Sequence, residues 1–209
     1  MSARRVVLWR HGRTTFNAQE RMQGQLDVPL DDVGRAQAGA AAAHLVDLGV
    51  GAVVASDLSR AVDTARAFTA LTGQDVRTDP ALREVFAGRW QGLLGAEIAR
   101  RWPDEHAAWR RGDDVRPGET GETRAELGER VAAAVARHAG PAEGTLLVVG
   151  HGAALKAGLV RLVGLPVQAA GALAGFRNGH WAVLAARGSG WVLEEYNAGP
   201  AGAAVGAEG

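Results

Sequence analysis

Three short apolar runs limit the folds that this chain can adopt. Residues 5–9, 51–55 and 145–149 each centre on an unbroken stretch of valine, leucine, alanine or tryptophan. Runs of this length and composition are typical of strands that are buried on both faces of a sheet. Further strands are predicted at residues 75–78, 172–187 and 191–196.

Helical patterns fill the intervals between these strands. They cover residues 31–48, 56–71, 95–111 with an interruption at Pro103, 123–138 and 153–163. Asp31 or Asp32 is expected to begin the first helix and Gly49 to end it, and Ser56 or Asp57 is expected to cap the second. Alternating strands and helices predict an α/β fold, with a largely parallel central sheet between two layers of helices.

The length of 209 residues is sufficient for one hydrophobic core, and we expect a single domain over residues 1–197. No internal repeat and no linker interrupts this range. Residues 198–209 lack a hydrophobic pattern, so we expect them to form a disordered C-terminal tail.

Composition excludes several classes of function. The 23 basic residues balance the 23 acidic ones, so the overall charge predicts neither a nucleic-acid partner nor a membrane surface. No apolar stretch approaches the roughly 20 residues of a membrane span, and no signal-peptide pattern follows the first residues. The absence of cysteine excludes disulfides, thiolate metal sites and cysteine nucleophiles. We expect a cytoplasmic protein without a metal or a cofactor.

The tripeptide Arg10-His11-Gly12 follows the first apolar run and suits phosphate chemistry. The guanidinium can attract and orient an anionic phosphoryl group, and a neutral imidazole can attack its phosphorus. Gly12 allows the backbone to approach a ligand closely because it has no Cβ. Alone, a His-Gly pair at the end of a strand is more often only a turn.

Three further residues are predicted to meet His11 at the same edge of the sheet. His151 follows the strand at 145–149, Arg60 lies where a helix begins after the strand at 51–55, and Glu84 follows the strand at 75–78. In open α/β sheets, ligands bind at the carboxyl ends of the strands. The sequence therefore predicts a nucleophile, a cationic clamp and a carboxylic acid in one site. His44, His106 and His138 lie in helical segments and are expected at the surface, and His180 could approach the site.

The chain resembles the histidine phosphatase superfamily, which includes the cofactor-dependent phosphoglycerate mutases. The resemblance covers residues 5–178, and its motifs appear in the expected order. They are Arg10-His11-Gly12 with Thr14 and Asn17; Leu30, Gly34 and Gln37-Ala38; Ser56-Asp57-Leu58-Ser59-Arg60-Ala61 with Thr64-Ala65; Glu84 with Gly88 and Trp90-Gln91-Gly92; Gly121-Glu122-Thr123 with Arg130; and Val149-Gly150-His151-Gly152. One departure is Arg13, where the family usually has glutamate or glutamine.

The resemblance implies a role for each site residue. His11 would accept the phosphoryl group and form a phosphohistidine intermediate, and Glu84 would protonate the leaving oxygen and then activate water. The phosphoryl oxygens would be held by Arg10, Asn17, Arg60 and His151. Such a site stabilises the charge of a phosphoryl-transfer transition state without a metal ion.

The resemblance also favours a phosphatase over a mutase. The related mutases carry a longer insertion after the glutamate, with a tyrosine and an asparagine-lysine pair that this chain lacks. Within the phosphatase branch, the resemblance implies glucosyl-3-phosphoglycerate as the expected substrate. This implies a small anionic phosphate ester as substrate, with Arg13, Arg21, Gln23 and Arg116 as candidate specificity residues.

Other interpretations remain open on the sequence alone. A phosphatase of α-ribazole phosphate or another small metabolite fits the catalytic residues equally well. A phosphate-binding regulatory module would use the same fold without turnover, although it would not need Glu84. A strand near residues 191–196 could pair at the sheet edge and form a homodimer.

Overall fold

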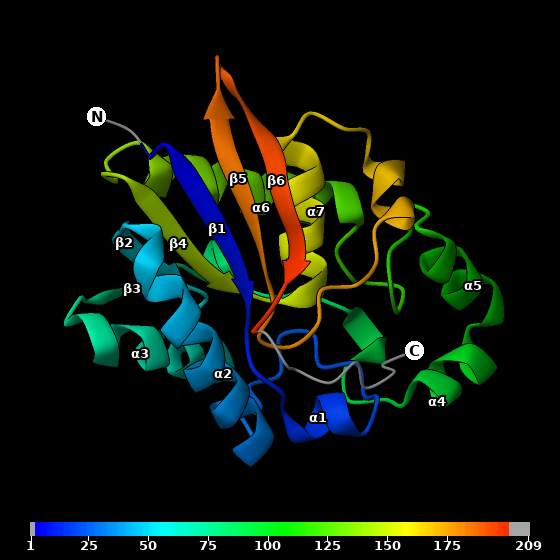
Figure 1. The fold of residues 1–209 in the computed structure, drawn as a ribbon. Coiled ribbons are helices and arrows are strands. Elements are labelled where there is room, and N and C mark those ends of the chain that lie inside the picture. Colours follow the sequence, from blue (N-terminus) through cyan, green and yellow to red (C-terminus); the bar gives the residue numbers. More distant parts are fainter. Residues whose placement is uncertain (1–2, 201–209) are drawn as a thin grey trace.

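The computed structural model describes residues 3–200, which contain one six-stranded sheet with the order β3-β2-β4-β1-β5-β6 (Figure 1). The strands are β1 (Arg5–Arg10), β2 (Val50–Ala55), β3 (Val76–Thr78), β4 (Thr145–Gly150), β5 (Trp181–Arg187) and β6 (Gly190–Ala198). The first four strands are parallel, and β5 and β6 add an antiparallel extension beside β1. The predicted α/β class with a largely parallel sheet is therefore confirmed.

Helices cover both faces of the sheet because the strands are apolar on both sides. Alternate residues of β1 point to opposite faces. Val7 and Trp9 pack with α2 (Asp32–Leu45) and α3 (Ser59–Thr72). Val6 and Leu8 belong to the core that contains α6 (Arg124–Ala139) and α7 (Gly152–Leu162). Figure 1 shows these two helix layers on either side of the sheet.

Short elements gather beyond the carboxyl ends of the parallel strands (Figure 1). They are α1 (Thr15–Ala18), α4 (Gly95–Arg101) and α5 (Pro103–Arg111), together with the 3-10 turns η2 (Pro80–Leu82) and η3 (Gly88–Trp90). Two further turns, η1 (Val46–Leu48) and η4 (Val167–Ala172), follow α2 and α7. Among the described residues, no helix is long and apolar enough to cross a membrane.

The turn after β1 packs directly on the start of α2, and glycine makes this possible. A Cβ at Gly12 would lie 2.1 Å from the Gly34 carbonyl oxygen, and a Cβ at Gly34 would lie 2.0 Å from the Arg13 carbonyl oxygen. Asp31 caps α2 as predicted, because its side chain accepts a hydrogen bond from the Gly34 amide. Two backbone segments therefore approach closely where the candidate nucleophile lies.

Two local predictions are wrong. The helix predicted from Ser56 or Asp57 begins at Ser59, and its N-cap is Leu58 without a side-chain hydrogen bond. Asp57 pairs with Arg83 instead, so its carboxylate has a partner other than the helix.

The strand predicted at 172–187 begins only at Trp181. The preceding residues, rich in alanine and glycine, form the end of η4 and a loop. The side chains of Tyr196 and Asn197 in β6 donate hydrogen bonds to backbone carbonyl oxygens of this loop. The expected tail begins within β6, which continues to Ala198, and residues 201–209 lie outside the described range.

We expect Gly34→Ala to lower the free energy of unfolding by about 2 kcal/mol, because the new methyl group would meet a backbone oxygen that cannot move away. Gly39→Ala on the same helix is the matched control. It has nothing within 4 Å of its Cβ position and should stabilise the protein by about 0.5–1 kcal/mol. Urea unfolding measures both. Equal effects of the two substitutions would contradict the proposed backbone contact.

Candidate active site

A cavity of about 620 Å³ lies at the carboxyl ends of the parallel strands. The residues predicted from the first strand, the α3 helix and the segment after β3 all reach it: Arg10, His11, Arg60 and Glu84 line it, whereas His151 lies behind His11 and does not. Asn17 and Asn178 lie beside them on the wall. The parallel strands therefore bring together side chains that are distant in the sequence.

His11 and His151 are neighbours because β1 and β4 pair in parallel. Arg10 is opposite Gly150 in this pairing, so the next residue of each strand is a histidine. The two imidazole rings lie 5.1 Å apart at an interplanar angle of 61°. Both side chains are buried, with His11 2% and His151 0% exposed.

One hydrogen bond fixes the tautomer of His11. Its Nδ1 lies 2.6 Å from the Gly12 carbonyl oxygen. Because a carbonyl oxygen only accepts hydrogen bonds, Nδ1 carries the ring proton and Nε2 carries the lone pair. Burial, followed by the positive charges of Arg60 and Arg10, holds the pKa of His11 well below the usual range. A neutral imidazole with a free Nε2 lone pair is a nucleophile.

His151 has the opposite tautomer. The Arg60 Nε donates to His151 Nδ1 at 3.2 Å, which leaves the proton of the neutral ring on Nε2. This Nε2 is buried and has no hydrogen-bond partner among the described residues. Burial, and then Arg60, lowers the pKa of His151 as well. His151 can therefore donate a hydrogen bond to an anionic oxygen beside His11.

Arg60 supplies a buried positive charge. Its side chain is fully buried, and its terminal nitrogens donate to the carbonyl oxygens of Leu26 and Gly24 at 2.7 and 2.8 Å. Burial lowers the pKa of Arg60 to about 10, so it remains charged at neutral pH. None of the carboxylates in the described range lies within ion-pair distance of it. Its charge is available to an anionic ligand.

Asn17 is oriented by the turn that carries it. Its Oδ1 accepts hydrogen bonds from the Thr14 amide and from the Asn178 side chain, both at 3.2 Å. The amide nitrogen of Asn17 is therefore the group left to donate to a ligand. Asn178, which the sequence interpretation did not select, also donates to the His11 carbonyl oxygen at 3.1 Å.

Glu84 is held at the N-terminus of α7. Its two carboxyl oxygens accept hydrogen bonds from the Ala153 and Ala154 amides at 3.1 and 2.9 Å, and from its neighbour Val85. The first residue of α7 follows His151 directly, so one helix start positions both groups. Glu84 also lines the cavity and can exchange protons with a ligand there.

Arg130 and Glu122 position the segment that carries Glu84. The Arg130 guanidinium forms two hydrogen bonds with the Glu122 carboxylate, at 2.8 and 2.7 Å. It also donates to the carbonyl oxygens of Ala81 and Arg83, at 2.8 and 3.1 Å. Arg130 on α6 and Glu122 in the loop before this helix therefore fix the backbone immediately before Glu84.

The candidate specificity residues do not share one location. Arg13, Arg21 and Gln23 line the cavity, whereas Arg116 does not. Arg116 forms an ion pair with Glu126 and donates to the Gly121 carbonyl oxygen. Arg13, the departure from the family pattern, pairs with the α2 cap Asp31 at 2.9 Å. Gln23 accepts a hydrogen bond from the Thr14 hydroxyl at 3.0 Å.

One wall of the cavity comes from α5, a helix that supplied none of the predicted site residues. His106, Trp109 and Arg110 line the cavity from this helix, at spacings that place them on one face. The prediction of a surface position for His106 is wrong, because its half-buried ring packs against Trp90 at 6.0 Å. The Arg110 side chain makes no hydrogen bond or ion pair with the rest of the described chain. The spacing of His106, Trp109 and Arg110 on one face of a helix was the signal in the sequence that could have indicated this wall.

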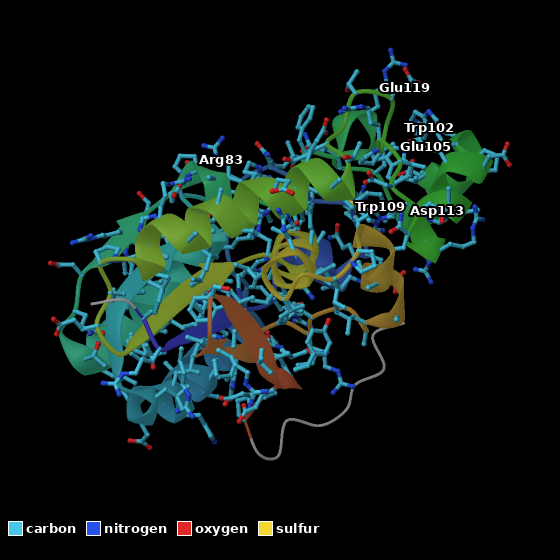
Figure 2. All side chains as sticks on the ribbon, turned by 90° about the horizontal axis from the view of Figure 1, so that it is seen from above. Arg83, Trp102, Glu105, Trp109, Asp113 and Glu119 are labelled. Atoms are coloured by element: carbon cyan, nitrogen blue, oxygen red, sulfur yellow. The ribbon has the colours of Figure 1, made fainter. Side chains whose placement is uncertain are left out.

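The outer corner of this wall is tied to the loop before α6. In Figure 2, Trp102, Glu105 and Glu119 lie together at this corner, and Trp109 lies further inward. The Trp102 indole donates to Glu119 at 3.2 Å, and Glu105 accepts from the Gly118 amide at 2.6 Å. These bonds hold α5 over the cavity.

Two neutral, buried histidines, His11 and His151, lie beside the buried cation Arg60 in an α/β fold. Together they define a phosphoryl-transfer site. The chain belongs to the histidine phosphatase superfamily (branch 1), whose profile matches residues 6–199. The predicted family and the predicted class of enzyme, a phosphoric monoester hydrolase, are therefore confirmed.

Individual relatives are similar over most of their length. The chain is 40% identical to glucosyl-3-phosphoglycerate phosphatase of Mycobacterium tuberculosis in an alignment of 215 positions, gaps included. This alignment covers 95% of this chain and 96% of that protein. It is 38% identical over 169 residues to a probable phosphoglycerate mutase of Enterobacter sp., with 78% and 77% covered. A solved structure of mycobacterial glucosyl-3-phosphoglycerate phosphatase with VO3 matches at a TM-score of 0.86 and 40% identity, covering 94% of this chain and all of that one.

We expect Arg130→Gln to lower kcat for an aryl phosphate by about tenfold or more, because a small misplacement of a catalytic group costs that much. KM should change little, since Arg130 does not line the cavity. Steady-state kinetics on folded protein measures both values. The control is Arg66→Gln, because Arg66 forms an exposed ion pair with Asp63 on α3. A wild-type kcat for Arg130→Gln would contradict the positioning role.

The free energy of unfolding should fall as the pH decreases below 6.5. In this range the unfolded chain binds protons at His11 and His151 that the folded protein does not bind, because both folded-state pKa values are lowered. Each histidine contributes up to about 1.4 kcal/mol per pH unit. Urea unfolding at pH 7 and at lower pH tests this. The slope should decrease in His11→Asn, and an unchanged slope would contradict the buried neutral state.

Proposed function

We propose that the protein hydrolyses phosphate monoesters through a phosphohistidine on His11, without a metal ion, and that its substrate is glucosyl-3-phosphoglycerate. The observation that carries the mechanism is the free Nε2 lone pair of His11 among buried donors and cations. The relatives named glucosyl-3-phosphoglycerate phosphatase support the substrate.

In the first step, Arg10, Arg60 and His151 bind the phosphoryl oxygens, and the Asn17 amide adds a hydrogen bond. His11 Nε2 attacks phosphorus and the P–O ester bond breaks. The Glu84 carboxylic acid gives its proton to the leaving oxygen. In the transition state, negative charge is spread over the equatorial oxygens of the phosphoryl group. The positive charges around these oxygens stabilise it, which is the main requirement of phosphoryl transfer.

In the second step, the Glu84 carboxylate takes a proton from a water molecule. The water oxygen attacks phosphorus, the P–N bond to His11 breaks, and inorganic phosphate leaves. His11 returns to its neutral state, and Glu84 is again protonated. One carboxyl group therefore acts as acid and then as base. A module that only binds phosphate would not need this group.

A second anionic group of the substrate fits the outer part of the cavity. Arg13 and Arg21 line it from the side of α1, and Arg110 lines it from α5. Arg13 is already paired with Asp31, and Arg21 donates to Gln19 and to the Gly92 carbonyl oxygen. Arg110 is therefore the cation best placed to receive the glycerate carboxylate.

The likeness to a probable mutase makes phosphoglycerate isomerisation the alternative. A mutase must protect its phosphoenzyme from water. Of the segment between Glu84 and His151, the described residues that line the cavity come from α4 and α5 alone, and such a small cover favours hydrolysis. We also propose a cytoplasmic location. We further propose a homodimer that pairs at the β6 edge, and size-exclusion chromatography with light scattering tests this oligomeric state.

A phosphate-release screen without added metal tests the proposal. Glucosyl-3-phosphoglycerate should give the highest kcat/KM among sugar, glycerate and α-ribazole phosphates, and His11→Ala should abolish turnover of all of them. Isomer formation from 3-phosphoglycerate with bisphosphoglycerate, in excess of free phosphate, would establish the mutase instead. Equal slow hydrolysis by wild type and His11→Ala would contradict an enzyme of either kind.

A further inference from the structure

A second cavity, of about 170 Å³, lies away from the candidate active site. It opens between α6, α7 and η4, and most of its lining is small or apolar: Ala125, Gly128, Ala157, Val160, Val167 and Ala170. A cavity of roughly this size holds a benzene ring in an apolar protein interior. Its walls offer an aliphatic or aromatic group a place out of water.

Arg124 at the start of α6 interrupts this apolar lining. The side chain is 8% exposed, and no carboxylate of the described residues forms an ion pair with it. One terminal nitrogen donates to the Trp109 carbonyl oxygen at 2.6 Å. Its Nε is buried and has no hydrogen-bond partner in the part of the chain that the structure describes. A buried cation with an unused donor favours an anionic partner.

The rest of the lining excludes strongly polar ligands. Arg161 lies on the rim, where Glu129 pairs with it at 2.5 Å. The remaining side chains provide no hydroxyl or amide group that could bind a sugar or a phosphate. The combination of one buried guanidinium and apolar walls fits a ligand with one carboxylate and an apolar body.

We propose that the cavity between α6, α7 and η4 is a binding site for a small apolar monocarboxylate. The carboxylate pairs with Arg124, and the apolar body packs against Val160 and Val167. This assignment is independent of the reaction at His11, because none of the residues that carry it lines the active-site cavity.

Two contacts connect this site to the wall of the active site. The Arg124 guanidinium lies 3.9 Å above the Trp109 ring, and Trp109 lines the active-site cavity. A Cβ at Gly112, directly after α5, would lie 2.9 Å from Gly171 of η4. A ligand between Arg124 and η4 therefore touches two elements that also hold α5. Binding should change the environment of Trp109.

Ligand-observed ¹⁹F NMR with 4-fluorobenzoate tests the proposal on the full chain, in saturating inorganic phosphate to occupy the catalytic site. The wild type should bind the probe at millimolar concentration. Arg124→Gln should weaken binding by about tenfold or more, because a charge-assisted hydrogen bond is lost. Val167→Phe should weaken it similarly by filling the cavity. Arg137→Gln, at the other end of α6, should bind as the wild type does.

Thermal unfolding shows which variants are folded. If Arg124→Gln does not fold, the binding of the probe to Val167→Phe decides whether this cavity is its site. The proposal is overturned if the wild type does not bind the probe, if phosphate displaces it, or if both cavity variants bind it as tightly as the wild type. None of these results bears on phosphate release at His11, so the proposed reaction is tested separately.

Discussion

The buried charge of Arg60 is the interaction on which the rest of the site depends. Taking a guanidinium out of water costs free energy, which here is offset by two backbone carbonyl oxygens and one imidazole nitrogen. The same bonds fix the 24–26 loop against α3 and determine the tautomer of His151. Because no carboxylate of the described residues pairs with this charge, it adds to the effect of burial in keeping both histidines neutral, and it attracts an anion.

Parallel strand pairing makes this arrangement possible. The register that sets Arg10 beside Gly150 delivers His11 and His151 to adjacent positions. The hydrogen bonds of these two rings then differ, so one presents a lone pair and the other presents a proton. A pair of chemically identical side chains thereby acquires two roles, nucleophile and hydrogen-bond donor, from its backbone surroundings.

The strand ends were predictable from the sequence, and so were the residues that depend on them. His11, Arg60 and His151 follow or closely follow buried apolar runs, so their meeting follows from the class of fold. Residues placed by irregular segments were harder to predict. His106 and Arg110 reach the cavity because contacts with segments distant in the sequence hold α5 in place, among them two hydrogen bonds to the loop before α6. Tautomers and the pairing of Arg116 with Glu126 depend on geometry that no local pattern encodes.

The most direct test of the account is to locate the phosphoryl group on the quenched enzyme. After rapid mixing with substrate and an alkaline quench, mass spectrometry and ³¹P NMR of the peptide that contains His11 identify the modified atom. The account predicts phosphorylation of His11 at Nε2, because Nδ1 is committed to the Gly12 carbonyl oxygen. Phosphorylation at Nδ1, or on a residue other than His11, would contradict it.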